Sequence, residues 1–203
     1  MAQPEIFVPF PESIRAAPMA TAVRSTMVIT SRRGIKERGY FEQYKRHIEA
    51  ASERTLEQAV AGVWLPIALG VDHYRACDAL HLTLAEQREL GGLALRRLRE
   101  TLMGTMAKNL GAAGIVSMWD VLRRYHTFYG AYFSGGGSRV WKAGPKDALL
   151  EIAGLPLARI PYLRHAYGGL LSEGARFFVR TSVVAEVPRM CNENGLGFRV
   201  SWV

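Results

Sequence analysis

The side chains that most often bind metal ions, histidine and cysteine, are few in this chain of 203 residues. There are five histidines and two cysteines, and neither a C-x-x-C pair nor an H-x-x-x-H pair occurs. His73 and Cys77 lie four residues apart, which would place them on one face of a helix. Two ligands do not make a zinc site, because such sites take three or four protein ligands. We therefore predict no metal site.

Four side chains are the best candidates for contact with a small molecule. His126 lies in an aromatic stretch with Tyr129, downstream of Trp119 on the same predicted helix, and it is the best candidate in the chain for a haem ligand. Cys77, on a predicted buried helix face, is a candidate for ligand contact or acyl attachment. Packing in the core or on the surface is the simpler explanation for all four residues. We predict no resident cofactor.

No motif of nucleotide binding or of nucleophilic catalysis is present. The glycines at 135–137 follow a predicted helix and match neither G-x-x-x-x-G-K-[ST] nor G-x-G-x-x-G, so they indicate a flexible loop. No G-x-S-x-G elbow occurs. We therefore predict that the protein is not an enzyme and has no catalytic residues.

The composition indicates a single globular domain. Apolar residues make up 49% of the chain and charged residues 22%, and no apolar run approaches the roughly 20 residues that span a bilayer. With few cysteines and no signal-like start, we expect a cytoplasmic protein. The net charge of +8 permits nucleic-acid binding. It does not favour it, because the basic residues are spread along the chain rather than gathered in one block.

Apolar spacing predicts a helical first two-thirds. Residues 1–20 are rich in proline, which predicts an extended lead-in, with a disordered tail as the alternative, before one domain over 21–203. A capping box at Thr83 and Glu86 marks the start of a long helix. The stretch 23–39 combines strand-like and helix-like patterns, and we interpret most of it as a helix. The predicted helices that follow cover 40–50, 55–60, 66–80, 83–109 and 115–133.

The last third predicts two β-hairpins around one helix. Residues 139–142 and 148–152 flank a turn at Gly144–Asp147, and a helix begins at Pro161. Two alternating runs, 182–187 and 197–203, close the chain. Because hairpins pair antiparallel strands, we expect an α+β fold. In it, the helical N-terminal two-thirds is followed by β-hairpin, helix and β-hairpin, which form one antiparallel sheet.

The ending of the chain has a recognisable order of features. A predicted helix with aromatic and glycine residues, Tyr162–Leu171, is followed by a strand, Cys191, a glycine and a final strand with Phe198 and Val200. This order resembles the ending of the small-molecule-binding 4-vinyl-reductase domain. Relatives of that domain include transport-particle subunits of the Bet3 type and haem-NO-binding domains. Over residues 24–203 the chain is also similar to a paralogous family of myxobacterial proteins.

The likeness to that myxobacterial family rests on four segments. They are Arg24–Gly39, Trp64–Pro66, Arg123–Tyr125 and Cys191–Trp202. The resemblances together imply a cytosolic, often dimeric module of helices and sheet that binds something apolar or mediates partner contacts. They do not imply catalysis.

The chain departs from these relatives in two respects. Haem-NO-binding domains hold the haem propionates with a Y-x-S-x-R motif, whereas here Tyr132-Phe133-Ser134 is followed by two glycines and the arginine is absent. This argues against haem. The cysteine clusters of some 4-vinyl-reductase domains are also missing, since only Cys191 matches.

Three hypotheses of function follow. The first is a non-enzymatic ligand-sensing or protein-interaction module, a homodimer through its long helices, that binds an apolar small molecule or a partner protein. The second is a nucleic-acid-binding protein that uses its positive charge. The third is a haem or tetrapyrrole sensor that uses His126.

Overall fold

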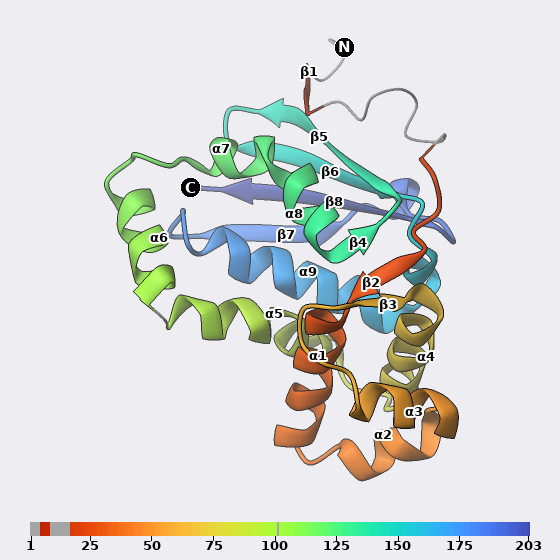
Figure 1. The fold of residues 1–203 in the computed structure, drawn as a ribbon. Coiled ribbons are helices and arrows are strands. Elements are labelled where there is room, and N and C mark those ends of the chain that lie inside the picture. The colour runs from red at the N-terminus through yellow and green to blue at the C-terminus, as the bar shows by residue number, and fades with distance from the viewer. Residues whose placement is uncertain (1–4, 9–16, 101) are drawn as a thin grey trace.

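The computed structural model describes residues 5–8, 17–100 and 102–203, and it has the predicted α+β architecture (Figure 1). The helices are α1 (Ser25–Glu37), α2 (Phe41–His47), α3 (Ala50–Glu57), α4 (Ile67–Asp78), α5 (Leu84–Arg99), α6 (Leu102–Ala112), α7 (Met118–Arg123), α8 (Tyr125–Tyr132) and α9 (Pro161–Ala175), with short 3-10 turns η2 (Pro156–Arg159) and η3 (Pro188–Met190). The strands are β1 (Glu5–Val8), β2 (Ala22–Arg24), β3 (Trp64–Pro66), β4 (Phe133–Ser134), β5 (Gly137–Gly144), β6 (Asp147–Ala153), β7 (Ser182–Glu186) and β8 (Gly195–Trp202).

Both predicted hairpins and the helix between them are confirmed. They build a five-stranded antiparallel sheet in the order β1-β5-β6-β8-β7. Alternate residues of β6, such as Leu150 and Ile152, are buried, and Leu150 pairs with the buried Phe198 of β8. This alternation gives the sheet one apolar face. Helix α9 packs against the sheet, and Figure 1 shows the long helices α5 and α9 running next to each other on its lower side.

A second, smaller sheet was not predicted from the sequence. It has three strands in the order β3-β2-β4, and each of them is only two or three residues long. It ties the start of α1 to the start of α4 and to the end of α8. Strands this short are not long enough to show an alternation of apolar and polar residues in the sequence. They are recognised only by their pairing with other strands in the folded protein.

Two predicted long helices are each divided in the structure. The helix predicted over 83–109 is α5 followed by α6, and an i→i+3 hydrogen bond from the Glu100 amide to the Arg97 carbonyl (3.1 Å) tightens the end of α5. The helix predicted over 115–133 is α7 followed by α8, which meet at Arg124. Here Ser117 and Asp120 form a capping box that starts α7. Apolar spacing continues across such breaks, so periodicity alone does not reveal them.

Most of the predicted lead-in, residues 1–4 and 9–16, lies outside the described residues. Of its described residues, 5–8 form β1, which pairs antiparallel with β5 through Glu5 opposite Lys142 and Ile6 opposite Trp141, and 17–20 have no regular secondary structure. Among the described helices, none combines the length and the apolar character that crossing a membrane requires.

Helices α5 and α9 approach each other unusually closely because each carries a pair of glycines at the contact. A Cβ atom on Gly91 of α5 would collide with the carbonyl oxygen of Ala166, and one on Gly169 of α9 would collide with that of Arg88. Only glycine allows two backbones to come this near. The contact fixes α9 against α5 and thereby forms one side of the site described below.

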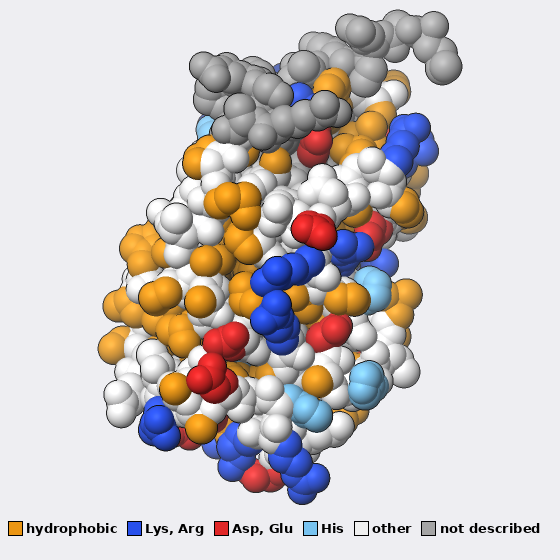
Figure 2. Space-filling model, turned by 90° about the vertical axis from the view of Figure 1, so that its right-hand side faces the viewer, with side chains coloured by type: hydrophobic (Ala, Val, Ile, Leu, Met, Phe, Trp, Pro, Cys, Tyr) orange, Lys and Arg blue, Asp and Glu red, His pale blue; other side chains and the backbone are white. Residues whose placement is uncertain are grey.

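Charges on the surface are mixed rather than segregated. Arg139 pairs with Glu151 (2.7 Å) and Arg199 with Asp147 (2.6 Å) across neighbouring strands. On the face seen in Figure 2, basic and acidic side chains lie among one another. The net positive charge therefore does not gather into a single large basic patch on this face.

Candidate functional site

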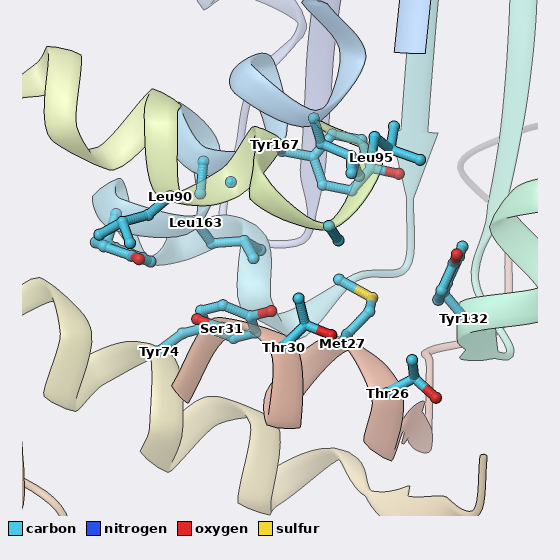
Figure 3. Close-up of a pocket in the computed structure, with 15 residues that line it drawn as sticks. Thr26, Met27, Thr30, Ser31, Tyr74, Leu90, Leu95, Tyr132, Leu163 and Tyr167 are labelled. Carbon is cyan, nitrogen blue, oxygen red and sulfur yellow. The ribbon is translucent and has the colours of Figure 1, made fainter. Parts of the chain in front are cut away.

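A cavity of about 90 Å³ lies between the N-terminal helices and the pair α5 and α9 (Figure 3). Helix α1 forms one wall, α5 and α9 form the opposite wall, and α4 and α8 contribute one tyrosine each. The residues that line it are Thr26, Met27, Thr30, Ser31, Tyr74, Leu90, Gly91, Ala94, Leu95, Tyr132, Tyr162, Leu163, Ala166, Tyr167 and Leu170.

The lining is apolar and carries no formal charge. Leu90 and Leu163 are buried, and Met27 and Leu95 are partly buried. Among the described residues that form the lining, none is acidic, basic or a histidine. An apolar cavity of this size suits a small uncharged molecule, because a charged group would lose its hydration without gaining a partner.

Hydroxyl groups are the polar feature of the lining, and they stay neutral. Burial raises the pKa of Tyr74, Tyr162 and Tyr167 well above the ordinary value of 10.0. The Tyr167 hydroxyl is bonded to that of Tyr125 on α8 (2.5 Å), and its ring stacks on Phe198 of the sheet at 5.8 Å. The Tyr167 side chain is thus held by α8 and β8 together.

Tyr74 differs from Tyr167 in that its hydroxyl has no hydrogen-bond partner in the described part of the chain, although the residue is only 4% exposed. Its ring is fixed between two others: it meets His73 edge to face at 4.7 Å and lies 6.2 Å from the ring of Tyr162. Figure 3 shows the side chain reaching from α4 to the space between α1 and α9.

A series of buried polar side chains lies next to Tyr74, on the side of α4 that faces α2. The Tyr44 hydroxyl is bonded to Nδ1 of His73 (3.0 Å), and Sγ of Cys77 lies 3.6 Å from Nε2 of the same ring. Burial, together with the positive charge of Arg32, lowers the pKa of His73 from 6.5 to about 3. His73 is therefore neutral and serves the packing of α4 against α2.

Arg32 is held at the edge of this series of side chains by a two-pronged ion pair. Its guanidinium donates to both carboxylate oxygens of Glu53, each at 2.8 Å, and lies over the rings of Phe41 and Tyr44 at 5.6 and 5.7 Å. The pair joins α1 to α3 and is only 10% and 13% exposed in its side chains. It stabilises the helical layer behind the cavity.

The four residues singled out by the sequence do not meet in one place, and none lines the cavity. His126 is exposed on α8, and its described side-chain contact is to the neighbouring Thr127. Cys77 is fully buried in α4, where burial raises the pKa of its thiol. Tyr129 is buried with an unpartnered hydroxyl, and the Trp119 indole donates to the Pro145 carbonyl (2.8 Å). In this structure Cys77, Tyr129 and Trp119 make packing contacts and do not line the cavity.

The sequence held one signal that pointed to the cavity. Pairs of glycines, Gly91-Gly92 and Gly168-Gly169, stand in the interior of two predicted helices, where glycine is unfavourable unless another backbone must come close. The pairs mark the α5–α9 contact, but the cavity beside it depends on α1 and α4 as well.

The scan against protein-family models finds no match, and the search of curated proteins finds none either. Solved structures do match, among them H-NOX proteins, that is, haem-NO-binding domains. A mutant of the H-NOX protein from K. algicida, in the Fe(II) unliganded state, has a TM-score of 0.59 at 10% identity, over 89% of this chain and 96% of that one.

Two further H-NOX structures agree with this match. A mutant of the H-NOX protein from T. Tengcongensis has a TM-score of 0.54 at 12% identity, over 88% of this chain and 97% of that one. The IWP-051-bound H-NOX from Shewanella woodyi, in the Fe(II)CO ligation state, has a TM-score of 0.53 at 16% identity, over 88% and 94%. Of the resemblances drawn from the ending of the chain, the one to haem-NO-binding domains is therefore confirmed at the level of fold, whereas the myxobacterial family stays a prediction. The chain has the H-NOX fold.

Proposed function

We propose that this protein is a non-enzymatic sensing module that binds a small, uncharged, apolar molecule in the cavity between α1, α5 and α9. The observation that carries the proposal is the uncharged apolar lining of that cavity, placed where the N-terminal helices meet the sheet layer. A ligand there touches both parts of the fold at once, and it shifts their relative arrangement to the extent that it binds one arrangement more tightly than another.

The H-NOX fold favours the haem-sensor hypothesis over the general module that the sequence places first. The residues around the cavity do not fit haem, however. A volume of about 90 Å³ is well below the roughly 300 Å³ at which pockets for larger ligands begin. The described lining residues include no histidine or cysteine to ligate iron, and no arginine or lysine to pair with the propionates.

His126, the candidate haem ligand from the sequence, does not provide the iron ligand that the cavity lining lacks. His126 lies on the exposed side of α8, outside the cavity lining. The sequence Tyr132-Phe133-Ser134 enters β4, and no arginine follows it within the motif spacing. Met27 and the tyrosines of the lining offer sulfur and oxygen atoms that could ligate iron, but none of them carries a positive charge to pair with a propionate carboxylate.

Addition of ferric haem to the purified protein, followed by absorption spectroscopy, decides between the two candidates. We expect the spectrum of unbound haem, unchanged in His126→Ala. A stoichiometric Soret band of bound haem would overturn our proposal and support the haem sensor.

Xenon under pressure tests the cavity itself, because dry apolar cavities take up xenon. We expect saturable chemical-shift changes in the NMR spectrum of the protein, confined to methyl groups of the lining. Ala94→Leu places a larger side chain in the cavity and should abolish them, whereas Ala51→Leu, on an exposed position of α3, should leave them intact. Shifts that do not saturate, or that persist in Ala94→Leu, would contradict the proposal.

Two other partners are expected from the sequence, a nucleic acid and a second copy of the chain. Nucleic-acid binding finds no support in the face shown in Figure 2, where charges of both signs alternate. Homodimerisation through the long helices stays a prediction. Helix α6 exposes Met106 (57%) and Leu110 (41%), which are apolar side chains available for such a contact.

A further inference from the structure

The hydroxyl group of Tyr74 is held at the wall of the apolar cavity, and it has no hydrogen-bond partner among the described residues. The residue is 4% exposed, lines the cavity, and has no hydrogen-bond partner in the part of the chain that the structure describes. Its oxygen is not one of the fully buried, unpartnered side-chain atoms among the described residues, so a molecule in the cavity can reach it. A ligand group that bonds to Tyr74 displaces no protein partner, so the complex gains one hydrogen bond.

The position of this hydroxyl is set by rigid neighbours. The ring of Tyr74 packs edge to face on His73, which is itself held by Tyr44, and lies beside the ring of Tyr162. A side chain clamped in this way loses little conformational freedom when a ligand binds. Two other tyrosine hydroxyls of the lining already have partners: that of Tyr167 is bonded to Tyr125, and that of Tyr162 is engaged with Ser31 and Cys77.

The other residues of the lining indicate the chemical character of the rest of the ligand. Opposite the α1 wall lie Leu90, Leu95 and Leu163, which offer only apolar groups to a ligand. Among the described lining residues there is no charged side chain to neutralise a carboxylate, a phosphate or an ammonium group.

We infer that the ligand of this cavity is a small neutral amphiphile, with an apolar body and one hydroxyl or carbonyl group that hydrogen-bonds to Tyr74. The inference rests on the proposed function and adds to it the chemical class of the ligand and the residue that selects it. Purely apolar molecules of the same size are bound more weakly, and anions are rejected.

Two isosteric probes test the inference by fluorine NMR. Trifluoroethanol and trifluoropropane differ by a hydroxyl in place of a methyl group, and both are small enough for the cavity. The full-length protein is titrated with each probe, well below the concentrations at which alcohols alter protein structure. We expect Tyr74→Phe to weaken trifluoroethanol binding by about 2- to 12-fold, which corresponds to one hydrogen bond. Its affinity for trifluoropropane should be unchanged or slightly higher.

Tyr129→Phe is the matched control, because it removes a tyrosine hydroxyl that also has no partner among the described residues but lies outside the cavity lining. We expect this variant to bind trifluoroethanol like the wild type. Equal binding of trifluoroethanol by the wild type and Tyr74→Phe would overturn the inference while leaving the cavity proposal in place, and so would an equal loss of binding in Tyr129→Phe. If neither probe binds and xenon also fails, the proposed function itself falls.

Discussion

Lowering the pH should destabilise this protein through one buried side chain, His73. The ring is fully buried in α4, bonded through Nδ1 to the Tyr44 hydroxyl and close to the Cys77 thiol. Burial and the nearby Arg32 charge lower its pKa from 6.5 to about 3. A histidine with a lowered pKa in the folded state opposes folding once the unfolded chain begins to take up the proton.

The sign and size of the effect follow from these two values. Above pH 6.5 the imidazole of His73 is neutral in both states, and the stability is fully present. As the pH falls toward 3, the unfolded chain binds a proton that the folded protein does not. Each pH unit in this window costs about 1.4 kcal/mol, so the free energy of unfolding should fall by about 2 kcal/mol between about pH 8 and about pH 5. That is a large share of the stability of an ordinary domain.

Urea unfolding followed by tryptophan fluorescence measures this loss at each pH. His73→Asn keeps a group that can bond to Tyr44 but removes the titration, so its stability should change less with pH than that of the wild type, by the amount worked out above. The variant is expected to be less stable at every pH, and the readout is the pH dependence rather than the absolute value. His126→Asn, on an exposed position, should retain the full dependence of the wild type. If the wild type and His73→Asn lose stability equally as the pH falls, the assignment of the effect to His73 is refuted.

Two further predictions concern contacts that hold the cavity walls in place. Arg32→Met leaves the Glu53 carboxylate without its partner and should cost about 3 kcal/mol of unfolding free energy, whereas Arg33→Met, which breaks an exposed pair on the same helix, should cost less than about 0.5 kcal/mol. Equal effects in denaturant unfolding would contradict the importance of the buried pair. Gly91→Ala drives a Cβ atom into the backbone of α9 and should destabilise by about 3 kcal/mol, while Gly130→Ala, with open space around it, should be neutral or stabilising by up to about 1 kcal/mol. A Gly91→Ala variant with wild-type melting behaviour would show that α5 and α9 do not need the glycine contact.

The β-sheet was predictable because its signals are local. In β6 the buried residues Ala148, Leu150 and Ile152 alternate with less buried ones, and a Gly-Pro turn precedes them. The start of α5 was equally clear, since the Thr83 hydroxyl and the Glu86 carboxylate make the expected capping box. These features depend on residues a few positions apart, which the sequence displays directly.

The candidate site was not predictable in the same way. His126 and Trp119 have the chemistry of ligand contacts, but α8 presents His126 to solvent and α7 presents Trp119 to the Pro145 carbonyl and the ring of Trp202. Whether an aromatic side chain lines a cavity or fills the core depends on which helix faces it. The neighbouring helix is determined by tertiary packing, which the spacing of residues along one helix does not predict.

Short-range patterns of residue type were enough to predict the class of the fold and the two hairpins around α9. The position of a ligand-sized cavity, by contrast, depends on contacts between residues that are far apart in the chain. The cavity takes its walls from five helices between Ser25 and Ala175, and it exists because paired glycines set the spacing of α5 and α9 while α1 and α4 close the space beside them.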